Sequence, residues 1–178
     1  MAYSIITITG HLGSGKSTIA KMLAQKLGWQ YYSTGMAQRT IAQKRGITAT
    51  ELNRLAITDP SIDAEIDGVF QNPPWGDAPC VVDSRLAFHF IPHSLKVCLQ
   101  VDTAVAAKRI FAQKGRLSEQ YTSEQEAYFD LQKRYELEQA HFMKNYQLDV
   151  TDLKQFDLVI DTSHLTPEQV FEKIVSAL

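Results

Sequence analysis

The sequence has little cysteine and no long apolar segment. Only two cysteines, Cys80 and Cys98, occur in 178 residues, each inside a short apolar run. Neither a disulfide framework nor a cysteine metal cluster can be built from them. No apolar stretch approaches the ~18 residues of a membrane span, and residues 1–10 carry no basic segment, so we expect neither membrane insertion nor an export signal. A reducing cytoplasm is the expected location.

The sequence also lacks a large excess of either positive or negative charge. Lys+Arg number 18 and Asp+Glu 20, which leaves a formal charge of −2, while 44% of the residues are hydrophobic. This balance excludes a disordered chain and a strongly basic nucleic-acid-binding protein. A chain of 178 residues is the size of a single domain.

Short apolar strands alternate with amphipathic helices along the chain. The strands are expected at residues 3–9, 29–32, 80–83, 95–101 and 156–161. Residues 34 to about 71 are expected to form successive helices without strands. The first runs to about residue 45 and ends at Gly46, the second opens with Thr48 and Glu51 in the capping-box pattern and runs through residue 57, and the third restarts at Asp59-Pro60. Further helices are expected at 103–113, 123–146 and from 167 onward. This alternation predicts an α/β fold: a five-stranded parallel sheet covered on both faces by helices, joined by right-handed crossovers.

A glycine-rich segment lies between the first strand and the first helix. Its sequence, Gly-His-Leu-Gly-Ser-Gly-Lys-Ser at 10–17, matches the phosphate-binding P-loop, so the predicted fold is a three-layer P-loop NTPase. Backbone N–H groups of such a loop bind phosphate oxygens, with the positive end of a helix behind them. Lys16 would reach the β- and γ-phosphates, and the Ser17 hydroxyl would coordinate Mg²⁺. The ATP-binding candidates here are Gly10, Gly13, Ser14, Gly15, Lys16, Ser17 and Thr18.

Two other P-loop classes lack their sequence signals here. A GTPase needs an Asn-Lys-x-Asp motif to bind guanine, and none is present. Motor and transporter ATPases usually end an apolar run on Asp-Glu, whereas the third strand ends on Asp83-Ser84. A compact kinase is therefore favoured, with Asp83 as a second candidate for the metal site.

The placement of the few arginines supports a kinase. Arg39 and Arg85 follow the carboxyl ends of the second and third strands, which is the edge of a parallel sheet where ligands bind. Arg109 lies in the helix after the fourth strand, while Arg116 and Arg134 flank a polar stretch. In the transition state of phosphoryl transfer, negative charge is spread over several oxygens, and arginines in fixed positions can stabilise it through bidentate hydrogen bonds.

At this level of detail the chain resembles the nucleoside monophosphate kinase family, most closely its short cytidylate kinase branch of archaea and some bacteria. The resemblance rests on the P-loop segment and on residues 32–39, 46–53, 59–67, 83–87 and 156–163. It implies one P-loop kinase domain with a helical acceptor-binding insert at about 34–71 and a lid at about 114–134. It also implies transfer of phosphate from Mg-ATP to CMP, dCMP or UMP by a monomeric enzyme without a nucleic-acid or membrane partner.

The resemblance also assigns roles to individual residues. Lys16, Arg85 and Arg134 would be catalytic, and Ser17 and Asp83 would hold the metal. Arg109, with Arg116 in the lid, would bind the donor nucleotide. The acceptor-binding candidates are Thr34, Gly35, Arg39, Asp67 and Arg85.

Five positions depart from the family pattern: Met36, Phe70, Gln113, His141 and Gln147. Two of them, Gln113 and His141, stand where arginines are usual. Two alternatives therefore stay open. One is a P-loop kinase for another acceptor, such as AMP, a nucleoside or a small metabolite; the other is a nucleotide-binding regulatory protein with weak catalysis.

Overall fold

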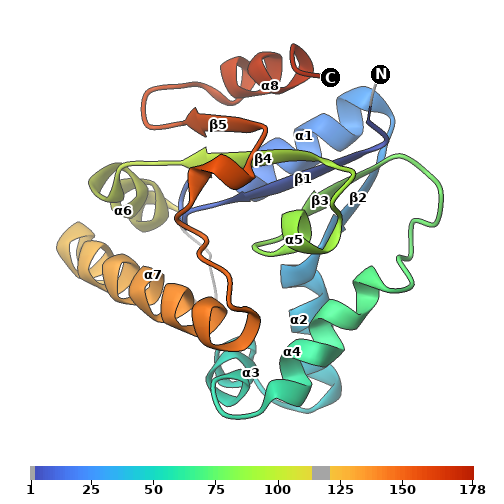
Figure 1. Cartoon of the computed structure of the whole chain (residues 1–178). Coiled ribbons are helices and arrows are strands. Elements are labelled where there is room, and N and C mark those ends of the chain that lie inside the picture. Colours follow the sequence, from blue (N-terminus) through green and yellow to red (C-terminus); the bar gives the residue numbers. More distant parts are fainter. Residues whose placement is uncertain (1–2, 114–120) are drawn as a thin grey trace.

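The computed structural model describes residues 3–113 and 121–178. Its centre is a five-stranded sheet in the order β2-β3-β1-β4-β5, with every neighbouring pair parallel (Figure 1). The strands are β1 Ile5–Gly10, β2 Gln30–Ser33, β3 Cys80–Asp83, β4 Leu95–Gln100 and β5 Leu158–Asp161. The predicted five-stranded parallel α/β fold is confirmed, with no strand boundary shifted by more than two residues.

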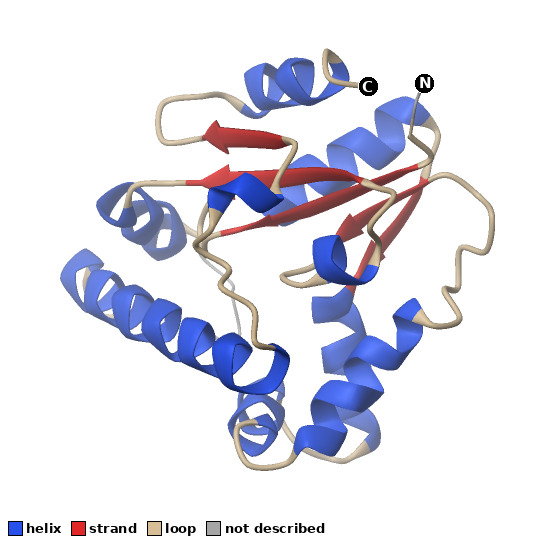
Figure 2. Ribbon diagram, in the orientation of Figure 1, coloured by secondary structure: helices blue, strands red, loops and turns tan. Residues whose placement is uncertain are grey.

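Helices connect the strands and cover both faces of the sheet (Figure 2). They are α1 Lys16–Leu27, α2 Thr34–Lys44, α3 Ala49–Ala56, α4 Pro60–Asp67, α5 Ala87–Phe90, α6 Thr103–Ala112, α7 Glu124–Tyr146 and α8 Pro167–Val175, with 3₁₀ turns η1 Gly68–Phe70 and η2 Leu153–Gln155. The sequence did not predict α5 and η2, because three or four residues are too few to show a helical period.

The main core lies between the sheet and the pair α1 and α8. Ile8 and Leu99 from the sheet meet Leu23 of α1 and Ile174 of α8, all fully buried. On the opposite face, Cys80 belongs to a second buried cluster. Burial raises the pKa of the Cys80 thiol to about 12, so this cysteine stays a protonated apolar residue, as does Cys98, whose pKa is raised to about 11.

Residues 34–70 form a helical unit with a small core of its own, in which Leu52 and Ile62 are fully buried. Side-chain caps define where two of its helices begin. The Thr48 hydroxyl accepts from the backbone N–H of Glu51 at 3.1 Å, and an Asp59 carboxylate oxygen accepts from that of Ser61 at 3.0 Å. These caps satisfy backbone donors that a helix start leaves without partners.

The long helix α7 spans the lower side of the molecule in Figure 1, from α6 to the helical unit of residues 34–70. Its first half packs on α6 through Ala127 and Leu131, both buried. It ends at Gln147, a non-glycine residue in the left-handed conformation with φ 54°. Of the predicted lid, residues 114–120 lie outside the described part of the chain. Within the described residues, no helix has the length and apolar character needed to cross a bilayer.

Candidate active site

A cleft of about 1310 Å³ lies where the carboxyl ends of the strands meet the P-loop, α2, α4 and α7. Most of the predicted site residues line it. These are Gly13, Ser14, Gly15, Lys16, Ser17, Thr18, Thr34, Gly35, Arg39, Asp67, Asp83, Arg85, Arg109 and Arg134. Arg116 lies outside the described residues, and Gly10 does not line the cleft.

Gly10 is instead required for the close contact between the P-loop and β4. Its φ is 137°, and a Cβ atom at this position would lie 1.9 Å from the carbonyl oxygen of Leu99. Gly13 and Gly15 also have positive φ angles, 78° and 88°, which L side chains adopt only with strain. The glycines therefore shape a loop that turns directly into α1.

Lys16 folds back over this loop. Its Nζ atom donates to the carbonyl oxygens of Gly10 at 2.9 Å and His11 at 2.8 Å. The ammonium group is thus held beside the N-terminus of α1, where the helix dipole already favours anions. Together they make a preorganised site for phosphate at one end of the cleft.

Ser17, in the first turn of α1, meets Asp83 at the carboxyl end of β3. Asp83 ends β3, and its partner in register is Ile8 of the central strand. The Ser17 hydroxyl donates to Asp83 Oδ2 at 2.5 Å. The hydroxyl of Tyr31 donates to the same oxygen at 3.3 Å, and burial, followed by the charge of Asp83, raises the Tyr31 pKa. The Ser17 hydroxyl and the Asp83 carboxylate are two adjacent oxygen ligands beside a phosphate site. They suit Mg²⁺, a hard cation that prefers oxygen ligands.

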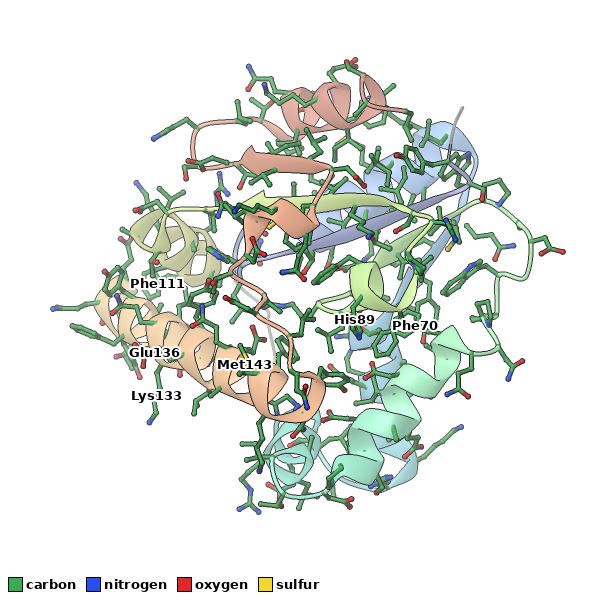
Figure 3. All side chains as sticks on the ribbon, in the orientation of Figure 1. Phe70, His89, Phe111, Lys133, Glu136 and Met143 are labelled. Atoms are coloured by element: carbon green, nitrogen blue, oxygen red, sulfur yellow. The ribbon has the colours of Figure 1, made fainter. Side chains whose placement is uncertain are left out.

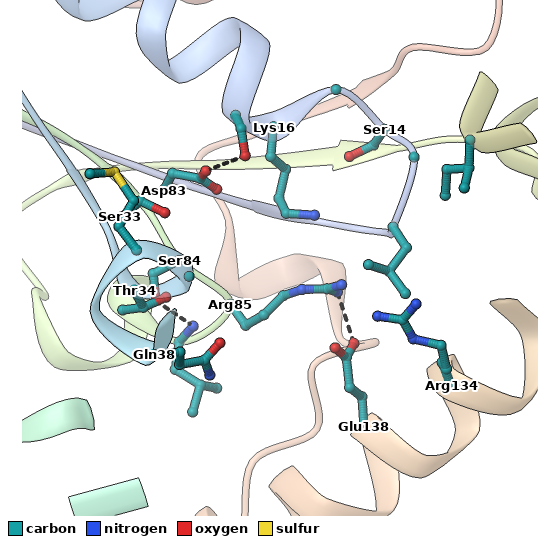
Figure 4. A pocket seen from close by; sticks show the side chains of 18 of the residues that line it. Ser14, Lys16, Ser33, Thr34, Gln38, Asp83, Ser84, Arg85, Arg134 and Glu138 are labelled. Atoms are coloured by element: carbon teal, nitrogen blue, oxygen red, sulfur yellow. Dashed lines mark hydrogen bonds and ion pairs between the residues drawn. The ribbon is translucent and has the colours of Figure 1, made fainter. Parts of the chain in front are cut away.

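Arg85 reaches into the middle of the cleft, as Figure 4 shows. Its main-chain carbonyl accepts from the Thr9 hydroxyl at 2.9 Å, which fixes the backbone beside β1. Its guanidinium Nη1 lies 2.9 Å from Glu138 Oε2 on α7. Arg134 lies one helical turn before Glu138 and also lines the cleft, so α7 brings a second arginine close to Arg85 (Figure 4).

Carboxylates gather at the other end of the cleft, where α7 contacts α4. Asp63 Oδ2 lies 2.9 Å from His141 Nε2 and accepts from Asn145 Nδ2, also at 2.9 Å. One turn later, Asp67 accepts a hydrogen bond from the Tyr146 hydroxyl. Burial raises the Asp67 pKa to about 6, although the Tyr146 hydrogen bond opposes the shift.

Three of the departures from the family pattern have a clear place. His141, where an arginine is usual, pairs with Asp63. Phe70 stacks on Phe90 with ring centroids 5.1 Å apart and is not among the residues lining the cleft. Met36 lines the cleft and is half exposed, so of these three it is the residue with an apolar side chain at the cleft wall.

Sequence reasoning missed several polar residues of the cleft, among them Tyr31, Asp63, Glu138 and Tyr146. Asp63 and Asp67 are four residues apart, as are Arg134 and Glu138, and this spacing places each pair on one helix face. That spacing was the available signal. Which helix face lines the cleft depends on tertiary packing, and residue spacing carries no information about that packing.

A parallel sheet with this strand order, a P-loop and a cleft lined by arginines defines a P-loop phosphotransferase. Residues 5–73 and 69–164 match the model of the cytidylate kinase-like family. The chain belongs to that family.

Individual relatives agree with this assignment. The cytidylate kinase of Sulfolobus acidocaldarius is 35% identical over 176 residues, covering 97% of this chain and 93% of that protein. An S-adenosylmethionine-dependent nucleotide dehydratase of Lacinutrix mariniflava is also 35% identical, over 171 residues and 96% of this chain, but the chain spans only 35% of its length. The shikimate kinase of Bacteroides thetaiotaomicron has the same fold, with a TM-score of 0.67 at 16% identity and coverage of 97% of both chains.

Proposed function

We propose that the protein is a cytidylate kinase, which transfers the γ-phosphoryl group of Mg-ATP to CMP or dCMP to give ADP and CDP or dCDP. The observation that carries the proposal is one continuous cleft. Lys16 and the P-loop line its donor end, Arg39 and Arg85 line its middle, and Asp67 lines its far end. The full-length match to the cytidylate kinase of Sulfolobus acidocaldarius supports this substrate class.

The P-loop end of the cleft is the proposed donor site. Its backbone N–H groups and Lys16 would bind the β- and γ-phosphates of ATP. Ser17 and Asp83 would hold Mg²⁺, which neutralises phosphate charge when bound. Arg109 would contribute by holding the loop in shape, because it donates to the Gly13 carbonyl oxygen at 3.4 Å.

The middle of the cleft is the proposed site of the acceptor phosphate. Arg39 and Arg85, with Thr34 and Gly35 at the start of α2, would bind and orient it. An acceptor phosphate oxygen then attacks the γ-phosphorus as the bond to the β–γ bridging oxygen breaks, and ADP leaves with the electron pair. Arg85, Arg134 and Lys16 would stabilise the charge spread over the transferring group.

The carboxylates at the far end favour a base with an amino group. Cytosine presents the N4 amino group as a donor, whereas uracil presents the O4 acceptor at the same position. A carboxylate can accept from the first and repels the second. Asp67, with Asp63 one turn away on α4, therefore supports CMP or dCMP over UMP as the acceptor.

One observation favours a nucleotide-binding protein with weak catalysis as a second candidate. His141 is paired with Asp63 at 2.9 Å, and in that contact it does not supply the phosphate-binding cation that the family has at this position. The second candidate predicts tight ATP binding without transfer to any acceptor. A kinase for another acceptor predicts a different choice among the acceptors offered.

The test is the rate of ADP formation from Mg-ATP with CMP, dCMP, UMP, AMP or GMP and without acceptor. A rate that rises selectively with CMP or dCMP supports the proposal. Lys16→Ala should lower that rate by on the order of 10²–10³-fold, the cost of removing one preorganised donor from a transition-state site. Lys26→Ala, which changes an exposed α1 lysine that does not line the cleft, is the matched control. Turnover in Lys16→Ala equal to this control would contradict the mechanism.

A further inference from the structure

Glu138 is a carboxylate that faces the cations of the cleft. It lies on α7 one turn after Arg134, and its Oε2 is 2.9 Å from Arg85 Nη1. Figure 4 shows its carboxylate paired with the Arg85 guanidinium group, with that of Arg134 nearby. The side chains of Arg85 and Glu138 are 22% and 31% exposed to solvent. Both line the cleft, so the pair is open to an incoming anion.

The surroundings of the pair hold its two backbones in place. The Arg85 carbonyl is bound by Thr9, and the next residue, Leu86, is buried. On α7, Tyr135 packs edge-on against His11 of the P-loop with ring centroids 4.7 Å apart. The pair can therefore separate by side-chain rotation alone, without moving either element.

His11 of the P-loop lies among the same charges. After burial, which lowers the His11 pKa most, the charges of Arg85 and Lys16 lower it further, while Glu138 acts in the opposite direction. Glu138 thus offsets part of the positive potential that Arg85 and Lys16 produce beside the P-loop.

We propose that Glu138 is a counter-ion of Arg85 and that a substrate phosphate must displace it in order to bind. A carboxylate and a phosphate are the same class of partner for a guanidinium group, and both bind it through charge-assisted hydrogen bonds. They therefore compete for Arg85. Glu138 lowers the affinity of the cleft for phosphate alone, so that Arg85 is engaged fully only by a ligand that other parts of the cleft also bind. Glu138 is a positioning residue, and the identity of the phosphate as that of a nucleoside monophosphate rests on the proposed function.

The test compares the binding of inorganic phosphate, measured by calorimetry, to the wild-type protein and to Glu138→Gln. The amide keeps the shape of the side chain and removes its charge, so phosphate should bind about fivefold more tightly, the upper end for a partly exposed ion pair. Glu136→Gln is the matched control, because Glu136 lies on the same helix and faces away from the cleft (Figure 3). It should bind phosphate as the wild type does.

A double-mutant cycle separates competition from a general change of charge. In an Arg85→Ala background, Glu138→Gln should change phosphate affinity by less than about twofold, because the competing cation is absent. Equal phosphate affinity in the wild type and Glu138→Gln, weaker binding in Glu138→Gln, or an undiminished effect in the Arg85→Ala background would each overturn the proposal. If Glu138→Gln does not fold, Glu138→Ala serves in its place.

The same proteins, titrated with CMP and with cytidine, distinguish this proposal from the proposed function. Cytidine lacks the phosphate, so its affinity should not respond to Glu138→Gln, whereas the affinity for CMP should rise. A response to inorganic phosphate without any binding of CMP would retain the role of Glu138 and reject CMP as the acceptor. Binding of CMP without any response of phosphate affinity to Glu138→Gln would retain CMP as the acceptor and reject the proposed role of Glu138.

Discussion

Arg109 connects three separate parts of the donor end, and its removal is the perturbation that we develop first. From α6, its Nη2 donates to the Thr162 carbonyl oxygen at 2.7 Å and to that of Ser163 at 3.3 Å. Its Nη1 donates to the Thr162 hydroxyl at 3.2 Å and to the Gly13 carbonyl oxygen at 3.4 Å. The Thr162 hydroxyl in turn donates to the Ser14 carbonyl oxygen at 3.1 Å.

The expected cost of Arg109→Ala follows from these contacts. The bonds at 2.7 and 3.2 Å are well formed, the two longer ones add little, and a hydrogen bond from a charged donor contributes about 1.5–3 kcal/mol. Thr162 is only 3% exposed, so solvent replaces the lost donor poorly. Because Arg109 itself is half-buried, we expect the free energy of unfolding to fall by about 2–3 kcal/mol, or the Tm by roughly 4–12 °C.

Urea unfolding followed by circular dichroism measures this loss. Lys108→Ala is the control, because Lys108 is the exposed neighbour on the same helix. Arg109→Lys should fall between the two, since a lysine keeps the charge but cannot bind several acceptors in one plane. If Arg109→Ala unfolds at the same urea concentration as Lys108→Ala, these bonds do not stabilise the fold and the reasoning is refuted.

Two further predictions concern positions where the chain carries local strain or an unfavourable charge. Gln147→Gly should raise the free energy of unfolding by about 0.5–1 kcal/mol, because glycine adopts the left-handed conformation of Gln147 without strain. The reverse exchange, Gly28→Gln at the end of α1, should lower it. Unfolding free energies equal to that of the wild type in both variants would contradict the strain. The raised pKa of Asp67 means that the folded state binds its proton more tightly than the unfolded state, so unfolding free energy should fall as pH rises from about 4 to about 6. In Asp67→Asn this fall should be smaller by about 1 kcal/mol, after allowance for the partial exposure of the carboxyl group, as urea unfolding at pH 4, 5, 6 and 7 would measure; identical pH profiles would contradict the shift.

Much of the fold could be predicted because its information is local. A run of β-branched residues, as at 5–9, followed by a glycine-rich loop identifies a buried strand and a P-loop without any long-range knowledge. The helix caps at Thr48 and Asp59 lie within three residues of their partners. Elements that depend on such neighbours were predicted to within one or two residues at most boundaries.

The cleft was only partly predictable, because its polar contacts join residues far apart in the chain. Arg85 and Glu138 are 53 positions apart, and Tyr146 and Asp67 are 79 apart. No periodicity in the sequence records which face of α7 meets α4. The roles predicted for the site residues, the lid role of Arg116, the monomeric state and the cytoplasmic location stay predictions.

The central claim is direct transfer of a phosphoryl group to a pyrimidine nucleoside monophosphate. A single-turnover reaction with ATP labelled in the γ-phosphate, Mg²⁺ and excess CMP tests it most directly. We predict that the label appears in CDP, with little in inorganic phosphate, and that Lys16→Ala abolishes its appearance on the same time scale. Label that stays in ATP, or that is released only as inorganic phosphate, would contradict the account.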